Sequence, residues 1–168
     1  MYADISGRSI IKAGTLPDVK ITFQNQTPMR PAEALQALDT VLASQRITTI
    51  FQGPQYVKVF PESEASVEGG PIIDLPPDQL PDSSSLLTYI VKPKQGLGQR
   101  LMSAVTPFAK FHASIIYIPG GSAVPAKAGL PPQISAIHGS DDILVLRDYS
   151  SNVRRMLKVL SESSMLDK

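Results

Sequence analysis

Cysteine is absent from the 168 residues of the chain, which excludes disulfide bonds, thiolate metal sites and cysteine nucleophiles. Long apolar runs are absent too, since no stretch approaches the roughly 20 uninterrupted apolar residues that span a bilayer. Residues 1–4 contain neither the basic region nor the apolar region of a signal peptide. We therefore expect a globular chain that begins as a mature or excised segment.

The chain also lacks a large excess of charge of either sign, because it has 16 basic and 15 acidic residues and a net charge of +1. No global field therefore favours nucleic acid or an anionic membrane as a partner. The charges are unevenly placed, since residues 62–85 hold six carboxylates and no Lys or Arg, among several Pro, Gly and Ser residues. This composition predicts an extended acidic linker between one module at 1–61 and a second, mildly cationic module at 86–168.

In the first module the spacing of apolar residues changes along the chain. Residues 19–23 alternate apolar and polar side chains, which predicts a half-buried strand. Pro31 can take the first position of a helix with one apolar stripe, formed by Ala34, Leu35, Leu38, Val41 and Leu42. Two β-type runs, 47–51 and 56–60, flank Gly53 and predict a hairpin.

The second module repeats this mixture of strands and helices. Strands are expected at 87–91 and 114–118, and Gly96 and Gly98 mark a turn that enters a helix reaching about residue 108. Residues 119–132 are expected to form a loop. A hairpin is expected from 134–137 and 143–146, and a final helix, capped by Ser150 or Ser151, has an apolar face of Val153, Met156, Leu157 and Leu160.

Each module thus combines a short mixed or antiparallel sheet with one or two amphipathic helices. Helices of this length are not stable alone and must pack on the sheet. The predicted fold class is α+β, built as two small modules.

Particular strings resemble the periplasmic N-domains of secretins, the outer-membrane channel subunits of bacterial type II secretion and type IV pilus systems. Residues 89–92, 143–148 and 151–157 resemble the secretin repeat domain, which is KH-like. Residues 7–11, 19–23, 31–42 and 56–61 resemble the latter part of the first secretin N-domain, so the first module looks truncated at its N-terminus.

The resemblance implies a scaffold in the periplasmic part of an outer-membrane protein, with no enzymatic activity and no cofactor. Copies of the second module would pack side by side in a homo-oligomeric ring. The first module would face an inner-membrane secretion platform protein or the secreted substrate protein, and nucleic acid would not be a partner.

Four polar residues of the final helix are candidates for the contact between subunits: Asn152, Arg154, Arg155 and Lys158. The arginines and the lysine could form charge-assisted hydrogen bonds to carboxylates of a neighbouring subunit. They could equally form a solvated helix face, because exposed ion pairs contribute only ~0–1 kcal/mol. Asn152 could instead be a cap or turn residue.

The spacing of potential catalytic and metal-binding residues does not indicate a catalytic or metal site. His112 and His138 are the only histidines, and no motif joins them to Ser140 or to the adjacent pair Asp141 and Asp142. The turn at 96–98 lacks the third glycine of a dinucleotide fingerprint. Two alternative functions remain: a signalling module like those of TonB-dependent receptors, and a KH-like nucleic-acid-binding module, which the absence of a GXXG loop disfavours.

Overall fold

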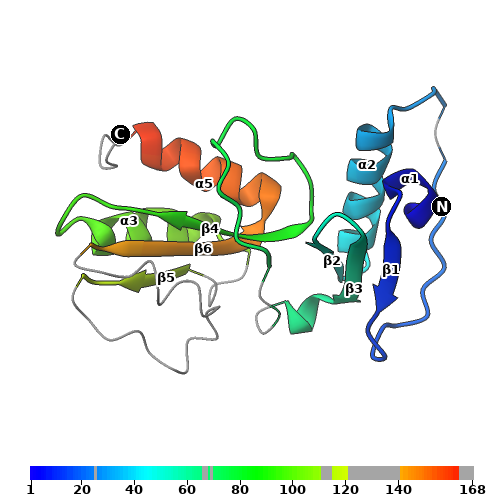
Figure 1. Ribbon diagram of the computed structural model, residues 1–168, viewed down its shortest axis with the longest axis horizontal. Coiled ribbons are helices and arrows are strands. Elements are labelled where there is room, and N and C mark those ends of the chain that lie inside the picture. The colour runs from blue at the N-terminus through cyan, green and yellow to red at the C-terminus, as the bar shows by residue number, and fades with distance from the viewer. Residues whose placement is uncertain (25, 66–67, 69, 111–114, 121–140, 163–168) are drawn as a thin grey trace.

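The computed structural model describes residues 1–24, 26–65, 68, 70–110, 115–120 and 141–162 (Figure 1). Two three-stranded sheets lie next to each other along the long axis of the molecule, and helices pack against each (Figure 1). The predicted fold class, α+β with two small modules, is therefore confirmed. Within the described ranges, no helix has the length and hydropathy needed to cross a membrane.

The first sheet is mixed and has the order β1-β3-β2, with β1 parallel and β2 antiparallel to the central strand. Its elements are α1 (Tyr2–Ser6), β1 (Ser9–Lys12), α2 (Pro31–Ser44), β2 (Ile47–Gln52) and β3 (Tyr56–Pro61). The predicted helix and hairpin are confirmed. Pro31 is the first residue of α2, and the Glu33 carboxylate accepts the backbone N–H of Arg30 at 2.9 Å, which completes the start of the helix.

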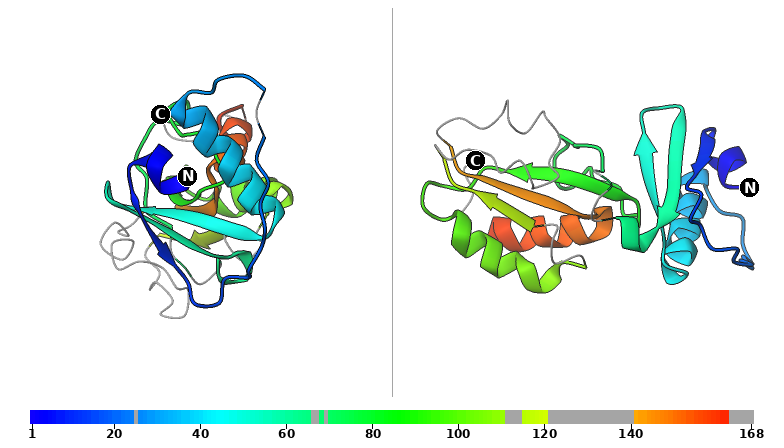
Figure 2. Two further views of the ribbon diagram at one scale, coloured as in Figure 1. Left: turned by 90° about the vertical axis from the view of Figure 1, so that its right-hand side faces the viewer. Right: turned by 90° about the horizontal axis from the view of Figure 1, so that it is seen from below.

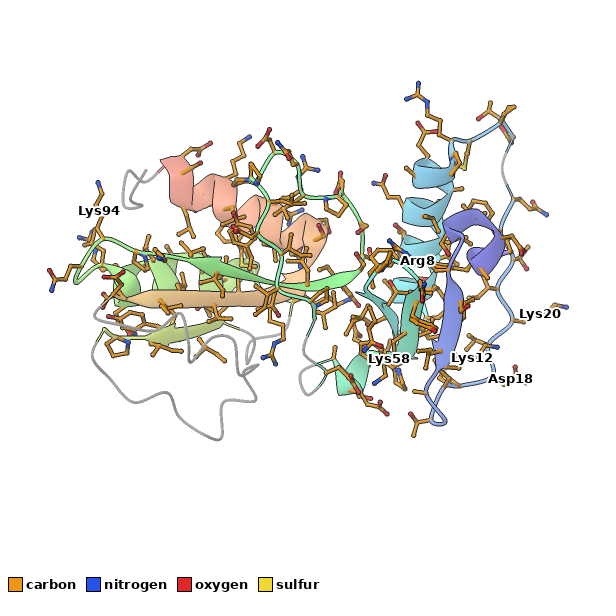
Figure 3. All side chains as sticks on the ribbon, in the orientation of Figure 1. Arg8, Lys12, Asp18, Lys20, Lys58 and Lys94 are labelled. Carbon is orange, nitrogen blue, oxygen red and sulfur yellow. The ribbon has the colours of Figure 1, made fainter. Side chains whose placement is uncertain are left out.

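Residues 19–23 do not form the predicted strand. Val19, Ile21 and Phe23 are half-buried while Lys20 and Thr22 are exposed, so the alternation of faces is present without a backbone ladder. The segment passes outside the first sheet, and Lys20 lies on the side of this module that faces away from the second (Figure 3). The strand prediction was wrong because alternation reports which side chains face the protein, and it does not report whether a partner strand is present.

The second sheet is antiparallel and has the order β4-β6-β5. The segment that forms it contains η1 (Glu62–Glu64), β4 (Leu86–Val91), α3 (Gly98–Val105), η2 (Thr106–Phe108), β5 (Ile115–Ile118), β6 (Ile143–Tyr149) and α5 (Ser150–Glu162). Figure 2 shows α3 and α5 together on one face of this sheet. Leu101, Leu146 and Met156, none of them exposed, join α3, β6 and α5 in one core.

The turn before α3 depends on two glycines. Gly96 has a φ of 77°, which favours glycine, and the helix begins at Gly98. A Cβ at Gly98 would lie 2.0 Å from Cε2 of Tyr117, so glycine allows the close approach of helix and strand. The predicted helix-entry turn is confirmed.

The segment expected to be an extended linker packs on the second module. Leu80 is 2% exposed and belongs to the core beneath α5. The backbone N–H of Ile73 donates to the carbonyl of Thr88 at 2.9 Å, so this segment also pairs with the edge of β4. Leu80, the partly buried Ile73 and this backbone pairing hold the segment against the second module. The boundaries of the two modules stay a prediction.

Several predicted features fall outside the described residues. These are the strand at 134–137, the loop from residue 121 onward, and both histidines, His112 and His138.

A buried carboxylate holds the first module together. Asp39 of α2 is 2% exposed, and its Oδ1 accepts hydrogen bonds from Tyr2 Oη at 2.8 Å and from Thr49 Oγ1 at 3.0 Å. Its Oδ2 has no hydrogen-bond partner in the described part of the chain. Burial raises the pKa of Asp39 to about 6. Asp39 therefore connects α1, α2 and β2 at an energetic cost when it is ionised.

The variant Asp39→Asn tests this cost. The folded protein binds a proton at Asp39 more tightly than the unfolded chain does, so stability is lost as pH rises from about 4 through about 6. The loss should be about 2–3 kcal/mol in the wild type, and Asp39→Asn should remove it because the amide stays neutral. Urea unfolding across this pH range measures the difference between the two proteins. Asp78→Asn, at an exposed side chain, is the matched control, and an unchanged pH profile in Asp39→Asn would contradict the assignment.

Candidate functional site

Helix α5 presents the predicted contact residues because its opposite face is buried. Val153, Met156, Leu157 and Leu160 are at most 3% exposed and pack in the core, as predicted from their spacing. The remaining face of the helix points away from the second sheet and carries Arg155 and Lys158, which are both exposed. The structure thus places the cations of the last helix on one outer surface.

Asn152 makes an internal contact at the start of this helix. Its amide Nδ2 donates to Oδ1 of the buried Asp148 at 3.1 Å. The same carboxylate accepts the backbone N–H of Lys110 through Oδ2 at 2.7 Å, and thereby holds the segment that follows η2 against β6. The contact of Asn152 is consistent with the role of a turn residue, and its role between subunits stays a prediction.

Acidic residues of the same chain flank the cationic face. A groove of about 490 Å³ lies between α5 and the preceding segment, lined by Pro77, Asp78, Asp82, Ser151, Arg154, Arg155, Leu157, Lys158 and Ser161. Arg154 Nη1 lies 3.9 Å from Asp82 Oδ2, and both side chains are partly exposed. The sequence did not predict this arrangement, because its composition indicated that the acidic segment is an extended linker without packing contacts.

The start of α5 is also bound to this segment. The backbone N–H groups of Ser150 and Ser151 donate to the carbonyls of Ser85 and Ser83, at 3.0 and 3.1 Å. The hydroxyl of Ser150 donates to the carbonyl of Pro81. The first backbone N–H groups of a helix have no partners within the helix, and these bonds supply them. They also fix the position of the acidic segment relative to the cations of α5.

The two sheets meet at Tyr149, the last residue of β6. Its hydroxyl lies 3.0 Å from Thr48 Oγ1 of β2 and donates to Glu62 Oε1 at 3.2 Å. Lys110 Nζ forms an ion pair with the same Glu62 oxygen at 2.6 Å and lies 5.0 Å from the centre of the Tyr149 ring. Burial raises the pKa of Tyr149 to about 12, so the hydroxyl stays protonated and can donate.

Apolar contacts and a backbone bridge support the same joint. Ile50, Phe60, Ala65 and Leu86 form one buried cluster, in which Leu86 comes from the second sheet. Thr49 of β2 forms an isolated parallel bridge with Ser85, directly before β4. The two modules are therefore packed against each other, and we refer to this region as the joint.

A groove of about 630 Å³ opens at the joint. It is lined by Pro17, Gln45, Arg46, Pro61, Glu62, Ser63 and Lys110. Two of the lining side chains are cations and one is a carboxylate, so the groove carries a net positive charge. No sequence motif indicated it, because its walls come from four separate segments.

Asp142 has a structural role. Its carboxylate accepts the backbone N–H of Gly120 at 2.9 Å, the hydroxyl of Tyr117 at 3.0 Å and the backbone N–H of Gly96 at 3.2 Å. The hydrogen bond from Gly120 lowers the pKa of this carboxyl. Asp141 is exposed, so the two neighbouring carboxylates do not face a common site. Among the described residues, no group of three or more potential metal ligands converges.

The variant Tyr149→Phe tests the joint. It leaves the buried Thr48 hydroxyl without its partner and should lower the free energy of unfolding by about 1–2 kcal/mol in urea. Adding Thr48→Val should recover part of this loss, because the unpaired hydroxyl is replaced by a methyl group of similar size. Tyr56→Phe is the control at a side chain that is 44% exposed, and an equal effect there would contradict the role of Tyr149.

No protein-family model matches the chain, and no curated protein matches it in sequence. Solved structures that are similar to it include the following two. A dimeric mutant of the N-terminal domain of the secretin XcpQ from Pseudomonas aeruginosa is 15% identical, with a TM-score of 0.33 over 98% of this chain and 58% of that chain. The GspC-GspD complex from the type II secretion system of enterotoxigenic Escherichia coli is 12% identical, with a TM-score of 0.32 over 96% and 87% of the two chains. This chain spans less than two thirds of the length of that XcpQ domain.

Proposed function

We propose that the chain is a ring-building and docking scaffold from the periplasmic part of an outer-membrane secretin, serving protein secretion or pilus extrusion. It acts by surface complementarity and carries out no catalysis. The second module is proposed to be a KH-like secretin repeat that packs beside its copies. The first module is proposed to contact an inner-membrane secretion platform protein or the secreted substrate.

One observation carries the proposal. The string with the strongest family resemblance, 152–157 after a strand and Asp148, lies in α5, and residues 143–148, which also resemble the family, lie in the central strand β6. They therefore build both the core of this module and the outer surface on which Arg155 and Lys158 lie. A scaffold needs a rigid core beneath a contact surface, and this arrangement supplies both.

The packed joint also supports a scaffold. If the modules were joined by a flexible tether, the position of the first module in a ring would not be defined by the packing of the second. Because Tyr149 and Leu86 connect the sheets, each copy can present its first module in the same orientation. A ring then multiplies weak contacts into a stable assembly.

Charge reversal at Arg154 and Arg155 tests the subunit contact. In the full-length protein, Arg154→Glu combined with Arg155→Glu should lower the yield of multimers about tenfold or more, because like charges would face each other across the interface. Membrane fractionation followed by gel electrophoresis without boiling measures this yield. Arg100→Glu, at an exposed residue of α3, is the matched control for a charge reversal elsewhere.

An unchanged multimer yield in the double variant would remove these residues from the interface. A soluble monomer for the wild-type full-length protein would contradict the ring itself.

A further inference from the structure

Arg46 has an unusual backbone conformation at the edge of the joint groove. It follows the C-cap of α2 and has a φ of 58°, and among the described residues it is the one non-glycine residue with a positive φ. Glycine is the favoured residue at this position, because a Cβ crowds the backbone in the left-handed region. An arginine held in a strained position suggests that its side chain is needed there.

The guanidinium of Arg46 is available for a ligand. The side chain is exposed, and the described part of the chain provides no hydrogen-bond or ion-pair partner for it. Lys110, the second cation of the groove, is 40% exposed although it already pairs with Glu62. Pro17 and Pro61 add apolar walls. These properties fit a ligand with a carboxylate next to an apolar side chain.

The chain itself carries such a group on a loop at residues 74–79. Asp74 is exposed, and the adjacent Leu75 is 41% exposed. The loop is held in place because Tyr89 Oη donates to the carbonyl of Leu75 and the N–H of Gln79 donates to the carbonyl of Pro76, both at 2.9 Å. A preorganised loop loses little conformational entropy when it binds.

The loop and the groove lie on opposite sides of the molecule. Figure 1 shows the green segment that follows residue 70 rising at the upper edge of the second sheet, while η1, which lines the groove, lies below the level of the sheets. The loop therefore cannot fill the groove of its own chain. A contact between two different surfaces is head-to-tail, and it closes into a ring when the rotation between copies allows it.

We propose that the acidic loop of one copy docks in the joint groove of the next copy, where Asp74 pairs with Arg46 and Leu75 packs against Pro17 and Pro61. This inference rests on the proposed assembly into a ring and adds the two surfaces that meet. It also accounts for the arginine at a position that favours glycine.

The absence of native cysteine allows a direct crosslinking test in the full chain. Ser63→Cys places a thiol at the groove and Pro76→Cys places one on the loop beside Leu75, both at exposed side chains. A disulfide forms only when the two Cα atoms approach within about 7 Å. Oxidation of the double variant should give a ladder of dimers, trimers and larger products on a non-reducing gel, whereas each single variant can give dimers at most.

Two substitutions of Arg46 separate binding from folding. Arg46→Gly relieves the backbone conformation, so the variant should unfold at the same or a higher urea concentration, yet it should reduce the ladder about tenfold because the charged hydrogen bonds are lost. Arg46→Lys keeps the charge and should retain most of the ladder. A ladder that is unaffected by Arg46→Gly would overturn the proposal.

Sedimentation of the uncrosslinked chain distinguishes the remaining outcomes. Assembly without crosslinking between positions 63 and 76 would overturn the proposed docking and leave the ring-building function intact. A chain that neither assembles nor crosslinks would contradict both. Crosslinked dimers without larger products would indicate a two-fold contact and would overturn the head-to-tail arrangement.

Discussion

The contact of Tyr149 with the first module is the constraint on which the arrangement of both sheets depends. Tyr149 ends the central strand β6 and directly precedes α5, so its position follows from the core of the second module. Its hydroxyl meets Thr48 and Glu62, while Leu86 brings an apolar side chain to the same region. Hydrogen bonds to charged groups and burial of apolar surface both stabilise the contact between the two sheets. This contact does not require the acidic segment to be rigid along its whole length.

The acidic segment has a different role from that of a spacer. Leu80 fixes it in the core, and the carbonyls of Ser83 and Ser85 receive the first amides of α5. As a result, Asp78 and Asp82 lie beside the cations of this helix, and Asp74 stands on an ordered loop. A chain with almost no net charge thereby presents acidic and basic surfaces in defined places. Such a distribution favours specific contacts with surfaces of complementary charge over non-specific binding to polyanions.

Local patterns predicted the elements whose partners are close in sequence. Pro31 and the apolar stripe gave α2, the two β-type runs gave the hairpin, and the face of α5 was read directly from spacing. The sequence pattern does not show which distant segments pair. Residues 19–23, for example, have the alternation of a strand but do not form one. The packing of Leu80 was missed because the few apolar residues of this stretch, Ile72, Ile73, Leu75 and Leu80, are scattered among prolines and carboxylates without the period of a helix or a strand. The cations of α5 were visible in the sequence, but the joint groove, including Arg46, appears only when four segments fold together.

The distance between the modules tests the account most directly. Spin labels at Gln36→Cys on α2 and Gln99→Cys on α3, both exposed positions, can be introduced without competing native thiols. Pulsed electron paramagnetic resonance on labelled chains diluted with unlabelled protein would then report distances within one molecule. The joint predicts a single narrow distance distribution that broadens when Tyr149→Phe is introduced. A distribution as broad as that of two modules on a flexible tether, already present in the wild-type background, would contradict it.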